Sequence, residues 1–253
     1  MTDALTLSYI NLFAILGALK PLCEMDPQAS VLIANKNISV GIAVKGGPCA
    51  TLHFEKGTVR VSEGISKCHI KLPFSSPEKF NGMIDGTVTP IPSKGFTKIG
   101  FLTGPFIKLT DLLTKYLRPT ADDLKNEAFF RISTKLMLHV ITAAVAQIGN
   151  LDKIGQASAS YMTDGVVRLS IKGEVATAIQ VHNHRLTVLP DVPELSQAMS
   201  YMEFADLHVA RELFDGQRNA VASVGEGLIC IGGMISQVDN VNRILDRVAL
   251  YLA

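Results

Sequence analysis

Short runs of alternating apolar and polar residues occur in two groups along the chain, and a long apolar stretch precedes each group. The apolar stretches, residues 4–24 and 121–148, predict helices, because apolar side chains in the second recur three or four residues apart. Alternation with a period of two predicts β-strands with one buried face. The predicted strands are residues 38–44, 50–54 and 58–61 in the first group and 158–162, 166–171, 176–181 and 185–188 in the second.

The elements after each group of strands also follow one order. Residues 75–86 and 201–216 predict helices, and each ends in Asp-Gly, which is a common helix stop. A predicted hairpin follows, at residues 89–101 and 219–233, and then a closing amphipathic helix. We therefore expect an α+β fold in which each half has a mainly antiparallel sheet covered by helices.

The two halves resemble each other in sequence, and this predicts a duplicated unit of about 120 residues. The joint is the segment LRPTADD, where Pro119 stops one helix and Thr120 can cap the next, with Asp123 as the acidic partner. The predicted domains are residues 1–118 and 119–253. Four blocks align in the same order: 12–26 with 138–152, 42–61 with 169–188, 83–100 with 213–230, and 109–117 with 244–252.

Composition and charge narrow the functional classes. A hydrophobic share of 47% with 19% charged residues indicates a globular protein with a large core. The formal net charge of +1 and the scattered lysines and arginines argue against a nucleic-acid-binding protein. The four cysteines have no zinc-like spacing, and the apolar N-terminal stretch lacks the charge pattern of a signal peptide and the length of a membrane span. We expect a cytoplasmic protein without stable membrane insertion.

The pair His182-x-His184 is the most conspicuous candidate for a metal site. In the repeat, Asn183 and His184 align with Lys56 and Gly57, and the first copy has no ligand there. This favours a hairpin turn in which Asn183 and His184 adopt the left-handed conformation. The glycine-rich segment 225–233 lacks the order of a phosphate-binding loop, and no nucleophile motif occurs. We expect no metal, no cofactor and no catalytic residue.

The elements in this order resemble the sterol-carrier-protein-like lipid-binding domain, once in each half. The residues that carry the resemblance are LHFEKGTVRVSEG, FNGMIDGTVTP and GFTKIGF in the first half, and IQVHNHRLTV, FDGQRNAVASVGEGLICIGG and NVNRILDRVALYL in the second. The resemblance implies a hydrophobic tunnel between a five-stranded sheet and its helices. It also implies a non-catalytic carrier for a sterol, fatty acid, acyl-CoA or phospholipid.

Apolar residues on the closing helix and the hairpin before it are the candidate tunnel lining, although a plain core has the same composition. The alternative is an interaction or regulatory module of the same fold with a filled core, which docks to an enzyme or to itself. A homo-oligomer or an enzyme partner is therefore possible. The candidate residues are Ile99, Phe101, Phe106, Leu109 and Leu113 in the first half and Ile229, Ile231, Met234, Val241 and Leu245 in the second.

Overall fold

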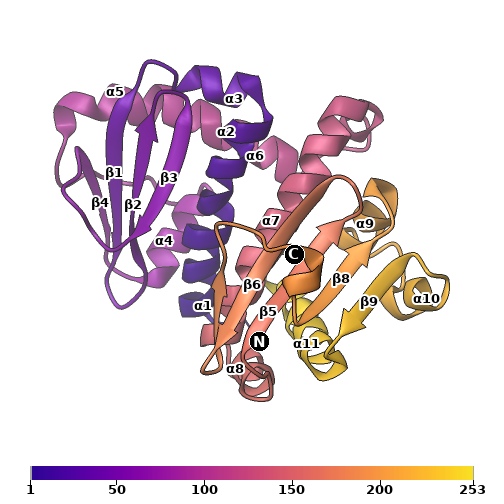
Figure 1. The fold of residues 1–253 in the computed structure, drawn as a ribbon. Helices are drawn as coiled ribbons and strands as arrows, with labels where there is room; N and C mark the ends of the chain where they lie inside the picture. Colours follow the sequence, from indigo (N-terminus) through magenta and orange to yellow (C-terminus); the bar gives the residue numbers. More distant parts are fainter. Residues whose placement is uncertain (1, 253) are drawn as a thin grey trace. The chain divides into compact units, whose positions relative to one another are not determined.

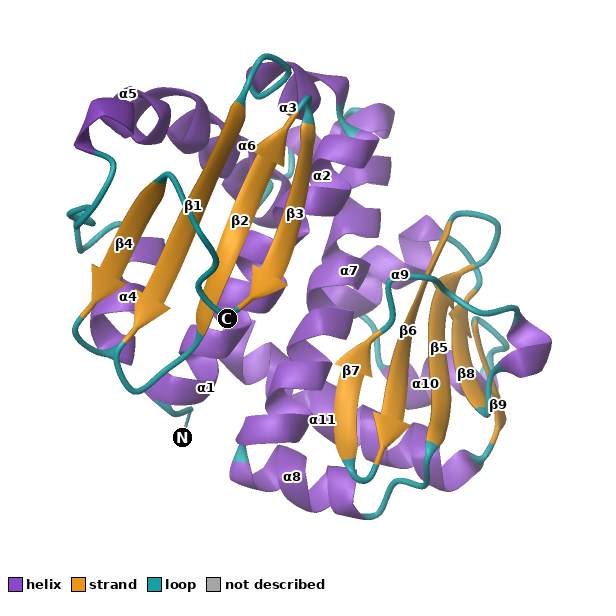
Figure 2. Ribbon diagram, turned by 60° about the vertical axis from the view of Figure 1, so that its left-hand side comes forward, coloured by secondary structure: helices purple, strands orange, loops and turns teal. Residues whose placement is uncertain are grey.

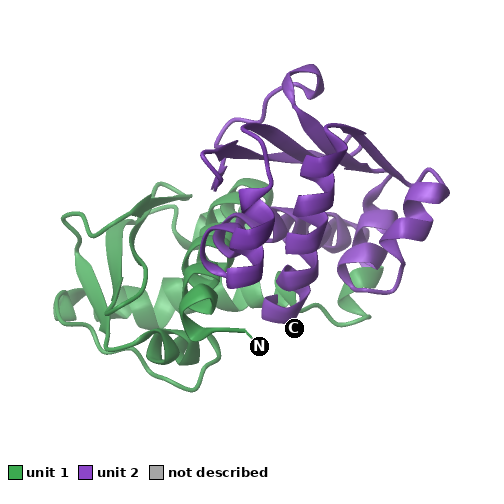
Figure 3. Cartoon of the chain, turned by 90° about the horizontal axis from the view of Figure 1, so that it is seen from below, with its two compact units in different colours: residues 1–125 green, residues 126–253 purple. Residues whose placement is uncertain are grey.

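The computed structural model describes residues 2–252, and the chain forms two compact units, residues 1–125 and 126–253 (Figure 3). The predicted boundary after residue 118 and the observed division after Lys125 both lie between the closing helix of one unit and the long helix of the next. Thr120 and Asp123 do cap each other, with Asp123 N donating to Thr120 Oγ1 at 3.2 Å. They begin only a short 3-10 turn, and Asn126 caps the long helix.

Unit 1 begins with helical segments that follow one another from residue 4 to residue 32 and ends with a second helical region. Helices cover one face of its four-stranded sheet, whose strand order is β3-β2-β1-β4 (Figures 1 and 2). The elements are α1 (Ala4–Tyr9), the π-helix η1 (Ile10–Ile15), η2 (Leu16–Ala18), α2 (Leu19–Met25), α3 (Pro27–Leu32), β1 (Asn37–Val44), β2 (Cys49–Glu55), β3 (Thr58–Glu63), β4 (Ile70–Phe74), α4 (Pro77–Ile84), η3 (Phe96–Lys98), α5 (Ile99–Phe101), the π-helix η4 (Leu102–Phe106), α6 (Ile107–Leu117) and η5 (Asp123–Lys125).

Unit 2 has a five-stranded sheet in the order β7-β6-β5-β8-β9, again with helices on one face (Figure 2). The first four strands have the same relative order as those of unit 1, and β9 adds a fifth. The elements are α7 (Glu127–Leu151), α8 (Lys153–Ser160), β5 (Gly165–Ile171), β6 (Val175–His182), β7 (Arg185–Val188), η6 (Leu195–Gln197), β8 (Ser200–Phe204), α9 (Leu207–Phe214), α10 (Ala220–Gly225), β9 (Ile229–Gly233) and α11 (Ile235–Leu252).

The α+β prediction is confirmed in its class, but both sheets are mixed. β1 pairs antiparallel with β2 and parallel with β4, and β5 pairs antiparallel with β6 and parallel with β8. The parallel pair arises because the chain crosses the open face of the sheet after the third strand and returns beside the first (Figure 2). In unit 1 this crossing passes so close to Gly41 that a Cβ there would lie 2.9 Å from Cys68 Sγ.

Several local predictions were wrong. Residues 158–162, predicted as a strand, include the end of α8, and the predicted helix 201–216 begins with strand β8. The predicted hairpin at 89–101 is reduced to one bridge between Lys71 and Lys94, followed by helical turns. The predicted hairpin at 219–233 is helix α10 followed by β9, which pairs with β8. The sheet of unit 1 therefore has four strands instead of five.

Two predicted turns and two predicted helix stops are confirmed. Asn183 and His184 have positive φ angles of 49° and 61°, and Lys56 in the matching turn of unit 1 has a φ of 47°. Two-residue turns with both φ angles positive suit the twist of a β-hairpin. Asp85 and Asp215 are the C-caps of α4 and α9, and the glycine after each has a positive φ.

One buried hydrogen bond joins the first and last helical regions of each unit in the same way. In unit 1, Asp26 caps α3 and accepts a hydrogen bond of 3.0 Å from Tyr116 Oη of α6. In unit 2, Asp152 caps α8 and accepts one of 2.9 Å from Tyr251 Oη of α11. We call these contacts the Asp–Tyr clamps, and both aspartates occupy matching positions in the aligned blocks.

The clamp of unit 2 contains a cation as well. Arg247 Nη2 lies 2.7 Å from Asp152 Oδ2, and both side chains are buried. Burial by itself would raise the pKa of Asp152, but hydrogen bonds from Arg247, the Gly155 amide and Tyr251, with the Arg247 charge, lower it to about 2. In unit 1, burial and the hydrogen bond to Asp26 raise the pKa of the Tyr116 phenol.

Two helical stretches, residues 4–25 and 127–151, are long and apolar enough to cross a membrane by length and composition. Each also supplies core side chains to its unit, including Leu12 and Leu19 in the first and Leu136 and Ile148 in the second. Core helices of globular proteins have the same length and composition as membrane-spanning helices, and both stretches pack in the core of their units.

Candidate functional site

Four of the five candidate residues in unit 1 lie in its interior, between helices and sheet. Phe101 and Phe106 pack edge-on against Phe54 of β2, with ring centroids 5.1 and 5.9 Å from the Phe54 centroid. Leu109 and Leu113 of α6 are also buried, whereas Ile99 faces outward with 45% of its surface exposed. The interior of unit 1 is thus occupied by its own aromatic side chains at the predicted tunnel.

The five candidates in unit 2 do not form one group. Ile229 and Val241 are buried, and Ile231 and Leu245 are partly exposed. Met234 is exposed, and its sulfur accepts a hydrogen bond of 2.8 Å from Thr163 Oγ1. In this half two of the candidate residues are buried, two are partly exposed and one is exposed.

Two cavities are open to solvent in unit 2, with volumes of about 200 and about 370 Å³, and charged residues contribute to both. The ten candidate ligand residues line neither of them. The first is lined by Glu127, Phe130, Arg131, Lys172, Glu174, Asp206, Leu207 and His208, and the second by Ile154, Ala157, Ser158, Tyr161, Arg243, Asp246 and Arg247.

The segment that carries Phe101 and Phe106 has an irregular helical path. We call residues 96–106 the cover segment; it passes from a 3-10 turn through one short α-turn to a π-helix that contains Pro105. Gly100 and Gly104 lie within it, and a Cβ at either position would meet open space. π-Helical turns and interior prolines weaken the regular ladder of helix hydrogen bonds, so this is a poorly reinforced part of the unit.

A small set of contacts fixes residues 93 and 94, just before the cover segment, to β4 and to the loop that precedes it. The amide of Lys71 donates to the Lys94 carbonyl at 3.2 Å, and the Ser93 amide donates to the Lys71 carbonyl at 2.9 Å. Lys94 Nζ also donates to the Cys68 carbonyl at 2.7 Å. The segment is therefore attached at one end by polar contacts and along its inner side by the two phenylalanines.

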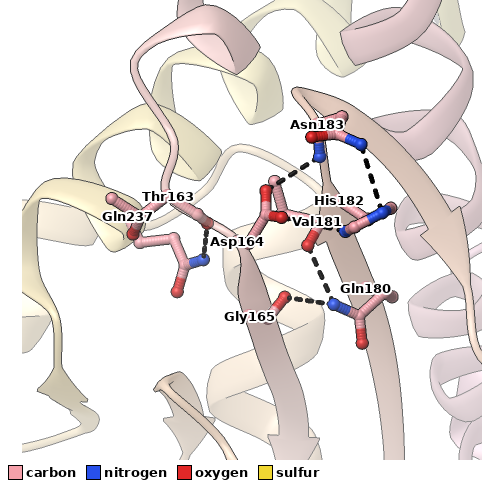
Figure 4. A network of polar contacts seen from close by, with 8 residues as sticks. All are labelled: Thr163, Asp164, Gly165, Gln180, Val181, His182, Asn183 and Gln237. Atoms are coloured by element: carbon pink, nitrogen blue, oxygen red, sulfur yellow. Dashed lines mark hydrogen bonds and ion pairs between the residues drawn. The ribbon is translucent and has the colours of Figure 1, made fainter.

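His182, the first histidine of the pair, belongs to a polar network around the β6–β7 turn (Figure 4). His182 Nδ1 lies 2.8 Å from Asp164 Oδ2, and Asp164 Oδ1 accepts a hydrogen bond of 2.8 Å from the Asn183 amide. Among residues 2–252 no group of three or more His, Cys, Asp or Glu residues could hold a metal ion. The network anchors the turn to the start of β5; Asp164 was not singled out by the sequence, because its partner lies 18 residues away.

Comparisons with solved structures find a likeness over part of the chain. No protein-family model matches the chain, and no curated protein matches it. A solved structure titled "UbiJ-SCP2 Ubiquinone synthesis protein" is similar, with a TM-score of 0.33 and 17% sequence identity. The match covers 43% of this chain and 95% of the other chain, so the likeness extends over less than half of the present sequence.

Proposed function

We propose that this protein is a non-catalytic binding protein for an apolar small molecule, such as a sterol, fatty acid, acyl-CoA or phospholipid, and that unit 1 holds the binding site. The observation that carries the proposal is the packing of Phe101 and Phe106, from an irregular segment, against Phe54. Two aromatic rings on a weakly reinforced cover can withdraw together and leave an apolar space between helices and sheet.

The driving force would be burial of the ligand's apolar surface. Each buried methylene contributes about 0.8 kcal/mol, so a long acyl chain offsets the loss of the phenylalanine contacts and the costs of association. Ligand binding and ring packing would then compete for the same space. This predicts that a smaller side chain at position 101 makes binding tighter.

The test is a titration of the delipidated full-length protein with a fluorescent fatty acid, together with native mass spectrometry of the protein as purified. Phe101→Ala should bind the probe several-fold more tightly than the wild type, because truncation of a buried phenylalanine leaves a cavity. Phe80→Ala is the matched control, since Phe80 is buried in α4 against Phe74 and lies outside the cover segment. Absence of probe binding by the wild type and by Phe101→Ala would refute the proposal.

Mobility of the cover segment can be tested separately. Gly100→Ala raises helix propensity by about 1 kcal/mol without a steric clash, and it should slow probe association. Gly17→Ala makes the same change in the first helical region, where a Cβ also meets open space. Equal association rates for the two variants would mean that the cover segment does not gate the interior.

A second candidate function is the interaction or regulatory module with a filled core. The close packing of the candidate residues in unit 1 favours it, because no ligand space is needed for docking. Protein purified without lipid that binds no probe, but associates with increasing concentration in analytical ultracentrifugation, would support this alternative over the carrier.

We also propose that the two units arose by duplication and that the protein acts in the cytoplasm. The shared strand order, the matching turns and the Asp–Tyr clamps support the duplication. The four cysteines are free thiols, which agrees with a reducing compartment.

A further inference from the structure

The outer side of the cover segment is apolar, although it faces solvent. Phe96 is 61% exposed, Ile99 is 45% exposed and Ile107 is 47% exposed. Phe96 and Ile99 are three residues apart, which is about one turn of the 3-10 helix that begins at Phe96, and Ile107 is the first residue of α6. Ile91, 75% exposed, precedes them, and we call the four residues together the apolar cover surface.

Positive charge accompanies these apolar residues. The sequence from residue 86 to residue 110 contains three lysines, Lys94, Lys98 and Lys108, and no aspartate or glutamate. Lys98 and Lys108 are exposed, while Lys94 Nζ donates to the Cys68 carbonyl. The chain as a whole has a formal net charge of only +1, so this part is distinctly more basic than the rest.

The inner side of the same segment is packed against unit 1. The apolar cover surface is therefore exposed while the segment is folded. Phe101 and Phe106 contact Phe54, and the bridge between Lys71 and Lys94 ties the chain just before the segment to β4. Helix α5 lies at one end of the sheet of unit 1, and α4 lies toward the other end (Figures 1 and 2).

We propose that the apolar cover surface docks on the surface of an anionic lipid membrane, with Phe96 and Ile99 in the interface and the lysines at the headgroups. Apolar residues flanked by lysines are the composition that binds at the headgroup boundary. A second copy of this chain fits less well. In a twofold dimer the same patch meets itself, and this would place the lysines of one copy against those of the other. The inference does not require that the interior binds a ligand.

The experiment is co-sedimentation of the full-length protein with vesicles of phosphatidylcholine alone and of phosphatidylcholine mixed with phosphatidylserine. Binding should need the anionic lipid and weaken with salt. Each lysine near the surface contributes about fivefold, so Lys98→Gln with Lys108→Gln should lower partitioning about thirtyfold. Phe96→Ser with Ile99→Ser should lower it about tenfold or more.

Two variants serve as matched controls. Lys79→Gln removes an exposed lysine in α4, and Val221→Ser replaces a valine that is 78% exposed in α10. Both should bind vesicles within about twofold of the wild type, in keeping with the usual small effect of isolated surface changes.

Three results would overturn the inference. The first is equal partitioning of the wild type onto neutral and anionic vesicles, and the second is unchanged partitioning of the lysine variant. The third is that Phe96→Ser with Ile99→Ser binds vesicles as the wild type does but no longer self-associates. Vesicle docking without binding of the fluorescent fatty acid would refute the carrier proposal and leave this inference standing. Probe binding without vesicle docking would do the reverse.

Discussion

Replacement of Asp152 by asparagine tests the buried pair of Asp152 and Arg247 in unit 2 against the clamp of unit 1, in which Asp26 accepts from Tyr116. Asp152→Asn leaves the buried Arg247 guanidinium without its counter-ion, and such a loss typically costs about 3–5 kcal/mol of folding stability. Asp26→Asn is the matched change in unit 1. Its single amide oxygen can accept from only one of the two donors, Tyr116 Oη and the Gln28 amide, so we expect a cost of about 1 kcal/mol.

The pH dependence of the Asp152 effect follows from its lowered pKa. The native pKa of about 2 lies below the ordinary value of 3.8, which corresponds to about 2 kcal/mol of stability above pH 4. That contribution is lost as the pH falls through the native pKa, because Asp152 is then protonated in the folded chain as well as in the unfolded chain. The stability difference between wild type and Asp152→Asn should therefore shrink between about pH 4 and pH 2.

The assay must report each unit separately, and the chain has no tryptophan to serve as a probe. Hydrogen exchange followed by mass spectrometry gives peptide-level protection in the full-length protein. A loss of about 3 kcal/mol lowers protection more than about a hundredfold in peptides of unit 2 and should spare those of unit 1. Equal costs for Asp152→Asn and Asp26→Asn, or a difference that urea unfolding shows to be independent of pH, would refute the reasoning.

Further variants test the turns, the crossing loop and the thiols. His184→Gly should raise the melting temperature, because glycine adopts a φ of 61° without strain. His184→Val should lower the melting temperature, because a β-branched residue at this φ costs about 1 kcal/mol of folding free energy. Gly41→Val should destabilise unit 1 by about 1–3 kcal/mol, measured by urea unfolding, because the loop already lies within contact distance of a Cβ at this position. Burial, with smaller effects from neighbouring carboxylates, raises the pKa of the Cys23 thiol to about 12, so maleimide should label exposed Cys49 and Cys230 in the native protein well before Cys23.

The sequence predicted those features that local backbone preference decides. The Asn183-His184 turn and the Asp85 and Asp215 helix stops could be found because a residue that tolerates a left-handed or capping conformation marks each position. The repeat strengthened each of these predictions, since two different residue pairs occupied the same turn.

Features that depend on distant partners could not be predicted in the same way. Strand β4 contains Pro73, and a proline argues against a strand because it has no backbone N–H to donate. β4 lies at the edge of the sheet, where a residue without this N–H is tolerated. The segment 89–101 has the glycine and prolines of a hairpin, and only its Lys94 bridge to Lys71 remains of one. Phe101 of the cover segment packs on Phe54 of β2, 47 residues earlier in the chain, and the alternation of apolar and polar residues carries no sign of this contact.

The Asp–Tyr clamps bear on the lifetime of the folded units. Tyr116 and Tyr251 reach back over 90 and 99 residues to their aspartates, whereas the β1–β2 and β5–β6 hairpins close through short turns. Closing a long loop costs more chain entropy than closing a short one, so the hairpins are expected to form early and the clamps late. Contacts that form after the transition state govern how fast a protein unfolds. A weakened clamp should therefore shorten the time each unit stays folded and leave the rate at which it folds almost unchanged.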